Sequence, residues 1–297
     1  MNTARVQAAP GVHLAVDDWA ADDRAVDDRA ADDRASDGHE PGARAFVLVH
    51  GLASNARLWD GVARELSARG HRVVMLDQRG HGRSSKPDKG YDFESITDDL
   101  RAVVDALGLA RPIVAGQSWG GNVVVEFAAR FPGRAAAIAA VDGGVIELGR
   151  QFPEWEACAK ALAPPELDGL PASRLEALIR AHHPDWPEEG IAGTLSNFEV
   201  RADGTVRPWL SRANHMSILR SLWEHKPSDC FPAITEPVLF IPARDENGGR
   251  IATTDALDGA LAKLKDGRVQ WMTGDHDLHA QHPVAVARAL TELRASV

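Results

Sequence analysis

The sequence predicts an α/β fold with a mostly parallel central sheet, helices on both faces and a helical insertion. Two observations support this prediction. From residue 45 onward, short apolar runs alternate with segments of helical periodicity, which is typical of parallel strands joined by crossover helices. The alternation stops between residues 143 and 232, a segment that holds nine of the seventeen prolines and four of the eight tryptophans.

Each core element has its own signal. Strands are predicted where short apolar runs occur, at 45–50, 73–77, 112–115, 135–141, 238–241 and 269–272. Helices are predicted at 55–69, 95–108, 123–130 and 253–265, and from 283 onward. Gly70 closes the first helix, Ser95 with Asp98 forms a capping box that opens the second, and Pro132 stops the third.

The chain therefore divides into three parts. Residues 1–44 form an N-terminal strand region, 45–142 and 233–297 form the α/β core, and 143–232 form the helical insertion. Within the first part, residues 17–36 repeat a five-residue unit four times, each copy with a pair of aspartates. A period of five suits neither a strand nor a helix, so we expect an expanded, solvated loop there.

Composition excludes several function classes. Lys and Arg total 33 against 43 Asp and Glu, a formal charge of −10, so nucleic acid is not an expected partner. Cys158 and Cys230 lack the spacing of a disulfide framework or a zinc site, and adjacent His182 and His183 have no third ligand. The first ten residues show no leader pattern and no long apolar stretch follows, so we expect a cytoplasmic protein without a membrane partner.

One motif supplies a candidate nucleophile. Residues 116–120 read G-x-S-x-G, with Ser118 at the centre, after a predicted strand and before a predicted helix. Small residues allow a tight turn that projects the serine hydroxyl from the carboxyl edge of a sheet. A serine hydroxyl is a weak nucleophile and needs a base, an orienting acid and donors for an oxyanion. The backbone N–H groups of Leu52 and Trp119 are the expected donors.

Four motifs make the chain resemble the α/β-hydrolase family, in its lid-bearing branch of serine hydrolases and esterases. They are His50-Gly51-Leu52, the run from Asp77 to Ser84, the turn from Gly116 to Gly121, and Gly274-Asp275-His276 with Gln281 and Pro283. The resemblance implies that the insertion is a lid over the active site. It also implies a catalytic triad in the chain order serine, acid, histidine.

The resemblance makes His276 the base, because Pro283 matches the start of the family's last helix. His279 is the alternative base. Family members more often have glycine directly before this histidine, whereas here Asp275 separates it from Gly274. His81, in the loop that the family uses for packing and turning, is interpreted as structural.

The resemblance places the acid after the strand at 238–241, which makes Asp245 our choice. The glycine that usually stands three residues earlier is Pro242 here. Asp142 ends the preceding core strand, a position from which some members supply the acid. Glu246 is a second alternative.

The expected activity is hydrolysis of a carboxylic ester, lactone or thioester through an acyl-enzyme, with neither a metal nor an organic cofactor. Trp119 and the lid tryptophans suggest a pocket for a small-molecule substrate with an apolar acyl group. The same motifs also serve carbon–carbon bond hydrolases, perhydrolases and lyases. A non-catalytic ligand-binding protein of this fold is a further alternative.

Overall fold

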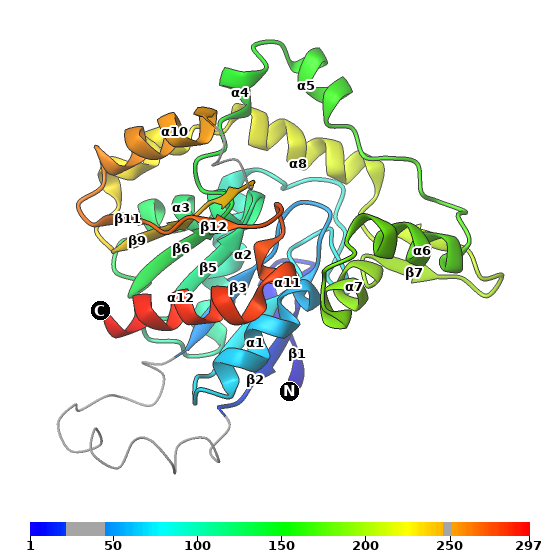
Figure 1. Ribbon diagram of the computed structural model, residues 1–297, viewed down its shortest axis with the longest axis horizontal. Helices are drawn as coiled ribbons and strands as arrows, with labels where there is room; N and C mark the ends of the chain where they lie inside the picture. The colour runs from blue at the N-terminus through cyan, green and yellow to red at the C-terminus, as the bar shows by residue number, and fades with distance from the viewer. Residues whose placement is uncertain (22–44, 246–250) are drawn as a thin grey trace.

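A computed structural model describes residues 1–21, 45–245 and 251–297 (Figure 1). Its central sheet consists of β1 (Asn2–Ala9), β2 (Val12–Trp19), β3 (Phe46–Val49), β4 (Val73–Leu76), β5 (Ile113–Gln117), β6 (Ala137–Val141), β9 (Val238–Ile241) and β11 (Gly267–Val269). Their spatial order is β1-β2-β4-β3-β5-β6-β9-β11. The β1–β2 and β2–β4 pairs are antiparallel and the others are parallel. The predicted α/β class with a mostly parallel sheet is therefore confirmed.

Helices cover both faces of the sheet. The core helices are η3 (Ala56–Trp59), α1 (Asp60–Ser67), α2 (Phe93–Ala106), α3 (Trp119–Arg130), α10 (Ile251–Leu261), α11 (Leu278–Gln281) and α12 (Pro283–Ala295). Among the residues described, no helix is both long and apolar enough to span a bilayer.

Strand alternation sends side chains into two separate cores. In β3, Val47 and Val49 enter the larger core with α2, α3 and α10, whereas Phe46 and Leu48 enter a second core with α1 and α12. In Figure 1, α1 and α12 accordingly cross one face of the sheet while α2 and α3 lie behind it. Because both faces are covered, the carboxyl edge of the parallel strands is the place left open for a site.

The insertion contains α4 (Leu148–Gln151), α5 (Trp155–Ala161), α6 (Ala172–His182), α7 (Glu188–Leu195), β7 (Phe198–Val200), β8 (Val206–Pro208), α8 (Arg212–Glu224), α9 (Pro227–Cys230) and η4 (Phe231–Ala233). We call α4 with α5 the α4–α5 arm, and α6 to β8 the α6–α7 arm. Figure 1 shows the two arms on either side of α8. The α6–α7 arm has a small core of its own, to which Trp186 belongs, and this core packs on Leu58 and Ala280.

Several element boundaries differ from the sequence-based expectation. Helix α2 begins at Phe93, because Asp92 caps it by accepting a hydrogen bond from Ser95 N over 2.8 Å. The strand expected at 269–272 is divided between β11 and β12 (Met272–Thr273), and β12 pairs with β10 (Ala243–Arg244) outside the main sheet.

The start of the acidic repeat is not a solvated loop. Strand β2 runs through the first repeat unit as far as Trp19, and Asp17 is 1% exposed. Asp17 accepts hydrogen bonds from Thr3 Oγ1 at 2.9 Å and from Arg83 at 2.7 and 2.9 Å, so its charge is paired. The correction applies to this first unit alone, because residues 22–44 lie outside the described part of the chain.

Candidate active site

Ser118 lies at a sharp turn between β5 and α3, with φ 54° and ψ −120°. Two glycines allow the backbone to crowd this turn. A methyl group on Gly143 would overlap the carbonyl of Ser118, and one on Gly51 would lie 3.2 Å from Ser118 Cβ. The segment after β3 and the segment after β6 therefore meet at the serine.

Three non-glycine residues in the described chain have positive φ: Ala53 at 60°, Ser118 at 54° and Asp142 at 40°. Side chains rarely adopt this conformation, because Cβ crowds the backbone. All three follow strands at the carboxyl edge of the sheet, in the segments that meet at Ser118. Backbone strain of this kind concentrates at functional sites, where the surroundings hold it in place.

The ring of His276 is hydrogen-bonded to Asp142, with 2.5 Å between Nδ1 and Oδ2. The other carboxylate oxygen of Asp142 accepts a hydrogen bond from Ala243 N at 2.9 Å. The Asp142 side chain is 6% exposed and that of His276 is 46% exposed. A carboxylate on Nδ1 favours the tautomer with its proton there, which leaves the Nε2 lone pair to accept a proton.

This geometry revises the choice of acid. Asp245, the first choice from the sequence, is an exposed residue just after β10, and the carboxylate on His276 Nδ1 is that of the alternative, Asp142. The reason is the register of neighbouring strands: β6 ends beside β9, whose continuation donates Ala243 N to Asp142. Glu246 lies outside the described residues.

The serine and histidine segments are joined through the neighbour of the nucleophile. Gln117 Nε2 donates to the backbone carbonyl of His276 over 3.1 Å. Ser118 Oγ itself forms no hydrogen bond with any described residue, and its side chain is partly exposed. Serine–base hydrogen bonds are often long before substrate binds, so this geometry is compatible with catalysis.

Both expected oxyanion donors have free N–H groups. In the described part of the chain, neither Leu52 N nor Trp119 N donates a hydrogen bond. The N–H of Trp119 is one of the first in α3, which have no acceptor within the helix. The next residue, Ala53, donates its N–H to His81 Nε2 at 3.2 Å, which fixes the turn that carries Leu52.

Two buried histidines hold the Leu52 turn. His50 Nε2 accepts from Gln78 N at 3.0 Å, and His81 stacks against the indole of Trp119 with ring centroids 5.7 Å apart. Burial lowers the pKa of His50 and lowers that of His81 well below its usual value. Both rings are neutral as a result, so each has a lone pair for the backbone N–H that it accepts. The contacts agree with a structural role for His81.

His279, the alternative base, is in the wrong place for proton transfer. It is 0% exposed, and its ring contacts Trp59 with centroids 4.3 Å apart. Neither ring nitrogen has a hydrogen-bond partner among the described residues, and burial lowers the pKa of His279 to about 3. The histidine at this edge that is both exposed and paired with a carboxylate is His276.

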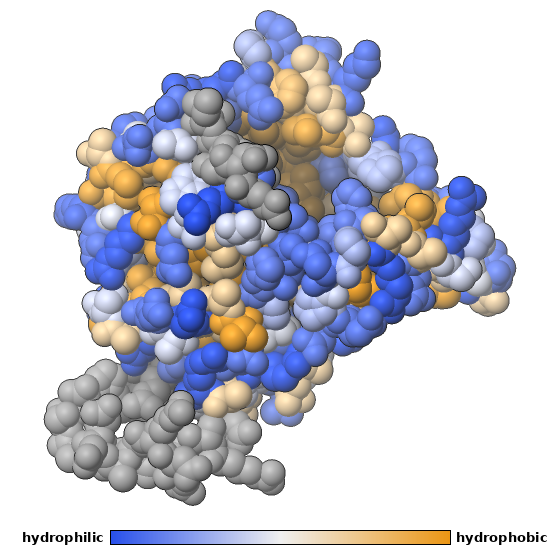
Figure 2. Space-filling view, viewed as in Figure 1, coloured by the Kyte–Doolittle hydropathy of each residue, from blue (hydrophilic) through white to orange (hydrophobic). Residues whose placement is uncertain are grey.

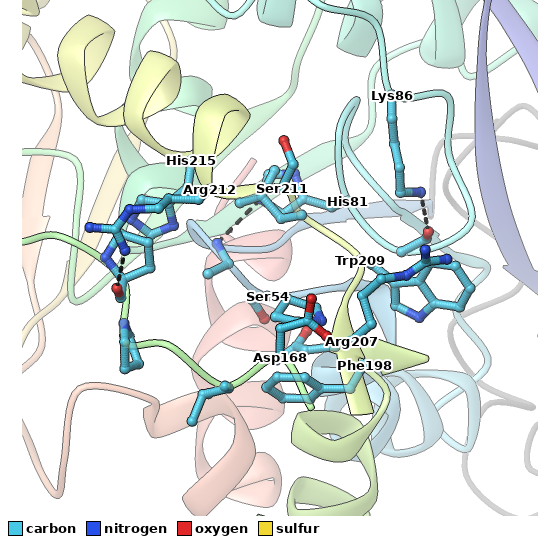
Figure 3. A pocket seen from close by; sticks show the side chains of 18 of the residues that line it. Ser54, His81, Lys86, Asp168, Phe198, Arg207, Trp209, Ser211, Arg212 and His215 are labelled. Atoms are coloured by element: carbon cyan, nitrogen blue, oxygen red, sulfur yellow. Dashed lines mark hydrogen bonds between the residues drawn. The ribbon is translucent and has the colours of Figure 1, made fainter. Parts of the chain in front are cut away.

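Two cavities are lined by different residues of the site. One of about 630 Å³ has Ala53, Ser54 and His81 in its wall and otherwise consists mainly of lid residues (Figure 3). Another of about 610 Å³ has Asp142 and His276 in its wall, together with residues of α4 and α10. Figure 2 shows a hollow with a largely hydrophobic wall between the two arms.

The lid tryptophans have different roles. Trp209 lines the larger cavity, Trp186 belongs to the core of the α6–α7 arm, and Trp155 contacts Trp223 edge-on. Trp119 is 1% exposed and supports the turn rather than a pocket wall. Only one of the four lid tryptophans therefore contributes to the cavities described.

One group of described side chains has the composition of a metal site. The ligand atoms of Glu126, His225 and Cys230 all lie within 4.8 Å of one another. Asn122, whose carbonyl accepts from Gly144 N, donates its amide to His225 Nδ1 at 3.1 Å, so His225 Nε2 carries the proton. That proton and the thiol of Cys230 point to Glu126 Oε2, at 3.1 and 3.0 Å. Hydrogen bonds satisfy the cluster, and a metal would have to displace both protons.

The sequence did not indicate the contacts around Asp275. Asp275 Oδ2 accepts the indole N–H of Trp186 at 2.7 Å, so a lid residue contacts the neighbour of His276. The sequence does show an aspartate between Gly274 and His276. It does not show which residue of the insertion this aspartate contacts.

An α/β sheet with a serine on a strained turn, and a histidine–aspartate pair at the same edge, defines the class of α/β hydrolases. Comparison with known proteins agrees. A family model described as alpha/beta hydrolase fold matches residues 44–174. The chain is 28% identical over 246 residues to a 2-(acetamidomethylene)succinate hydrolase of Mesorhizobium japonicum. This alignment covers 82% of this chain and 84% of that protein.

Solved structures show the same fold. The crystal structure of E-2-(acetamidomethylene)succinate hydrolase aligns with a TM-score of 0.76 at 22% identity, over 98% of both chains. An enol-lactonase from Burkholderia xenovorans aligns with a TM-score of 0.69 at 20% identity, over 98% of this chain and 99% of the other. The chain therefore has the α/β-hydrolase fold, and its sequence is similar to hydrolases of that family.

Proposed function

We propose that the protein is a serine hydrolase that cleaves a carboxylic ester, lactone or thioester through an acyl-enzyme. The observation that carries the proposal is the hydrogen bond between Asp142 and His276, beside a serine held on a strained turn. An exposed imidazole with a buried carboxylate on Nδ1 is the arrangement that activates a serine.

The mechanism assigns one role to each group. Ser118 Oγ attacks the substrate carbonyl while His276 Nε2 takes its proton. Asp142 stabilises the imidazolium that forms, and the N–H groups of Leu52 and Trp119 bind the oxyanion. A missing oxyanion donor costs about 3 kcal/mol of transition-state stabilisation in comparable hydrolases. His276 then protonates the leaving group, and water activated by the same ring releases the acyl group.

The larger cavity supports a small-molecule substrate with an apolar acyl group. Its wall includes a run of apolar lid side chains, namely Pro164, Pro165, Leu167, Phe198, Pro208, Trp209 and Leu210. Its volume of about 630 Å³ suits a ligand of drug-like size. We assign the acyl group to this cavity because the wall also contains Ala53, next to the oxyanion donor Leu52.

A second candidate substrate is a small carboxylate. Lys86, Arg207 and Arg212 line the same cavity (Figure 3), and the relative from Mesorhizobium japonicum is named for a succinate derivative. Arg212 lies 3.0 Å from Glu166, whereas Lys86 Nζ donates to the backbone carbonyls of Gly82 and Ser84. A substrate carboxylate would therefore find its charge complement near Lys86.

The proposal is tested by covalent labelling and a substrate panel. A fluorophosphonate probe is expected to label the wild type and not Ser118→Ala. Acyl esters of increasing length, a lactone, a thioester and 2-(acetamidomethylene)succinate form the panel. Ser118→Ala and His276→Ala are each expected to lose at least 10³-fold in kcat, since each removes a member of the triad.

His279→Gln is the matched control, because it removes an imidazole three residues away that contacts Trp59 instead of the site. We expect it to keep kcat within a few-fold once the folded fraction is taken into account. No probe labelling of the wild type, together with no turnover of any member of the panel, would favour a ligand-binding protein instead.

A further inference from the structure

The loop that carries His276 is bound to the α6–α7 arm of the lid. Trp186 donates its indole N–H to Asp275 Oδ2 at 2.7 Å, and His183 Nδ1 lies 3.4 Å from the same oxygen. A second hydrogen bond joins the same two segments, from Gln281 Nε2 to Asp185 Oδ2 at 2.5 Å. Three of the four consecutive residues 183–186 thus each contact either Asp275 or Gln281.

Asp275 transmits these contacts to the backbone on both sides of His276. Its second carboxylate oxygen, Oδ1, accepts from Asp277 N at 2.8 Å. Its own N–H donates to Gln281 Oε1 at 2.8 Å. One carboxylate therefore connects the lid with the residues directly before and after the histidine.

The lid side of the contact is rigid. Trp186 is 7% exposed and packs with Leu175, Ile179 and Ile191 in the core of the arm. The ring of His183 lies against the Trp186 indole with centroids 3.8 Å apart. Because this core also packs on Leu58 and Ala280, the indole N–H is held in place before it meets Asp275.

The His276 side needs such support. The His276 side chain is 46% exposed, so packing does little to hold the imidazole. The hydrogen bond to Asp142 and the position of the backbone of residues 275–277 both affect where the ring lies. A displacement of about 1 Å in a catalytic group is enough to lower a rate by about 10²-fold.

We propose that Asp275 is a positioning residue through which the α6–α7 arm sets the place of His276 relative to Ser118. The inference rests on the proposed function and adds a lid contribution to it. The arm acts on the chemical step through this contact, in addition to forming part of the cavity wall.

Trp186→Phe tests the proposal, because it keeps an aromatic ring in the core of the arm and removes only the indole N–H and part of the ring. Trp223→Phe is the matched control: the Trp223 indole donates to Phe152 O over the same 2.7 Å, away from the His276 loop. With p-nitrophenyl acetate as the probe, we expect Trp186→Phe to lower kcat about tenfold with KM changed less than about twofold. Trp223→Phe is expected to retain kcat within about twofold.

A measurement independent of activity follows the loop itself. Hydrogen–deuterium exchange in peptides covering 274–282 is expected to accelerate in Trp186→Phe and to stay at the wild-type rate in Trp223→Phe. If Trp186 were purely structural, its substitution would lower thermal stability without accelerating exchange in these peptides. It would also not lower kcat while leaving KM nearly unchanged.

Asp275→Asn is the second variant, and it keeps the proposal testable if Trp186→Phe folds poorly. Asparagine has one oxygen, so it cannot accept from both Trp186 Nε1 and Asp277 N. The variant that combines Trp186→Phe with Asp275→Asn is expected to have a kcat no lower than that of the slower single variant. The reason is that both changes break the same connection between the α6–α7 arm and the His276 loop.

Two results would separate the proposals. The positioning role alone would be overturned if Trp186→Phe and Asp275→Asn kept the wild-type kcat and exchange rates while Ser118→Ala lost activity. Retention of activity in Ser118→Ala would overturn the proposed function, whatever the lid variants show.

Discussion

Asp142 binds two chain segments at once, and this explains why the protein tolerates its strained backbone. A non-glycine residue at positive φ costs about 1–3 kcal/mol. Here the conformation directs one carboxylate oxygen to Ala243 N and the other to His276 Nδ1. The strain thus orients a carboxylate that is 6% exposed and accepts a hydrogen bond at each oxygen.

Asp142→Asn is expected to lower kcat by about 10³- to 10⁴-fold with little change in KM. Asparagine offers one oxygen to two donors, so its amide would face either Ala243 N–H or the His276 ring and favour the wrong tautomer. Asp245→Asn is the control and is expected to stay within about threefold of the wild type. Steady-state kinetics with an activated ester measures both, and the opposite ranking would return the acid to Asp245.

Single residues differ in how well the sequence identifies them. Ser118 and His276 are marked by local patterns, a glycine-flanked serine between strand and helix and a histidine seven residues before a helix-opening proline. The acid has no such pattern, because both Asp142 and Asp245 follow strands at the same edge. The choice of Asp142 depends on its hydrogen bond with His276, across 134 positions of chain, which the sequence does not reveal.

Among the elements, α2 fixes the loop that supports the oxyanion turn. Arg79, two residues before His81, donates two hydrogen bonds of 2.6 Å to Asp99 in α2. The two side chains are 6% and 4% exposed, so neither charge has water as a substitute partner. Arg79 also donates to Gly90 O at 2.8 Å, which binds the loop to the start of the helix.

Asp99→Ala is expected to lower the free energy of unfolding by about 3–5 kcal/mol, because it leaves the Arg79 guanidinium buried and unpaired. Asp105→Ala on the same helix is the control. Asp105 is 45% exposed and pairs with two exposed arginines, Arg101 at 3.4 Å and Arg134, so its loss should cost about 1 kcal/mol or less. Urea unfolding followed by circular dichroism compares the two, and equal losses would contradict the role given to the buried pair.

Core elements were largely predictable and lid elements were not. Strands such as β3 and β6 are continuous apolar runs, and their helices carry their own caps and stops. The β7–β8 hairpin has strands of three residues, too short for an alternating pattern to be seen. The insertion is recognisable by its loss of alternation, but its division into two arms depends on contacts with Leu58 and Ala280 that are distant in sequence.

At the scale of the whole molecule, burial keeps four histidines of the described residues neutral. They are His50, His81, His215 and His279, each at most 8% exposed. Burial lowers the pKa of each ring, to about 4 for His215 and to about 3 for His279. In the unfolded chain each ring titrates near pH 6.5. Below that pH the unfolded state binds protons that the folded state does not, so stability falls as pH falls.

His279→Leu tests this linkage at the most strongly shifted histidine. Between pH 6.5 and 5 the stability of the wild type is expected to fall more steeply with pH than that of the variant. The difference in slope corresponds to up to about one proton bound on unfolding, or about 1.4 kcal/mol per pH unit. Carboxylates whose pKa is lowered in the folded state, such as Asp92 and Glu126, add to the loss only nearer pH 4. Free energies of unfolding from urea titrations at half-unit pH steps measure the slopes. Above pH 7, where His279 is neutral in both states, the two slopes should coincide, and equal slopes below pH 6.5 would show that His279 takes up its proton in the folded protein.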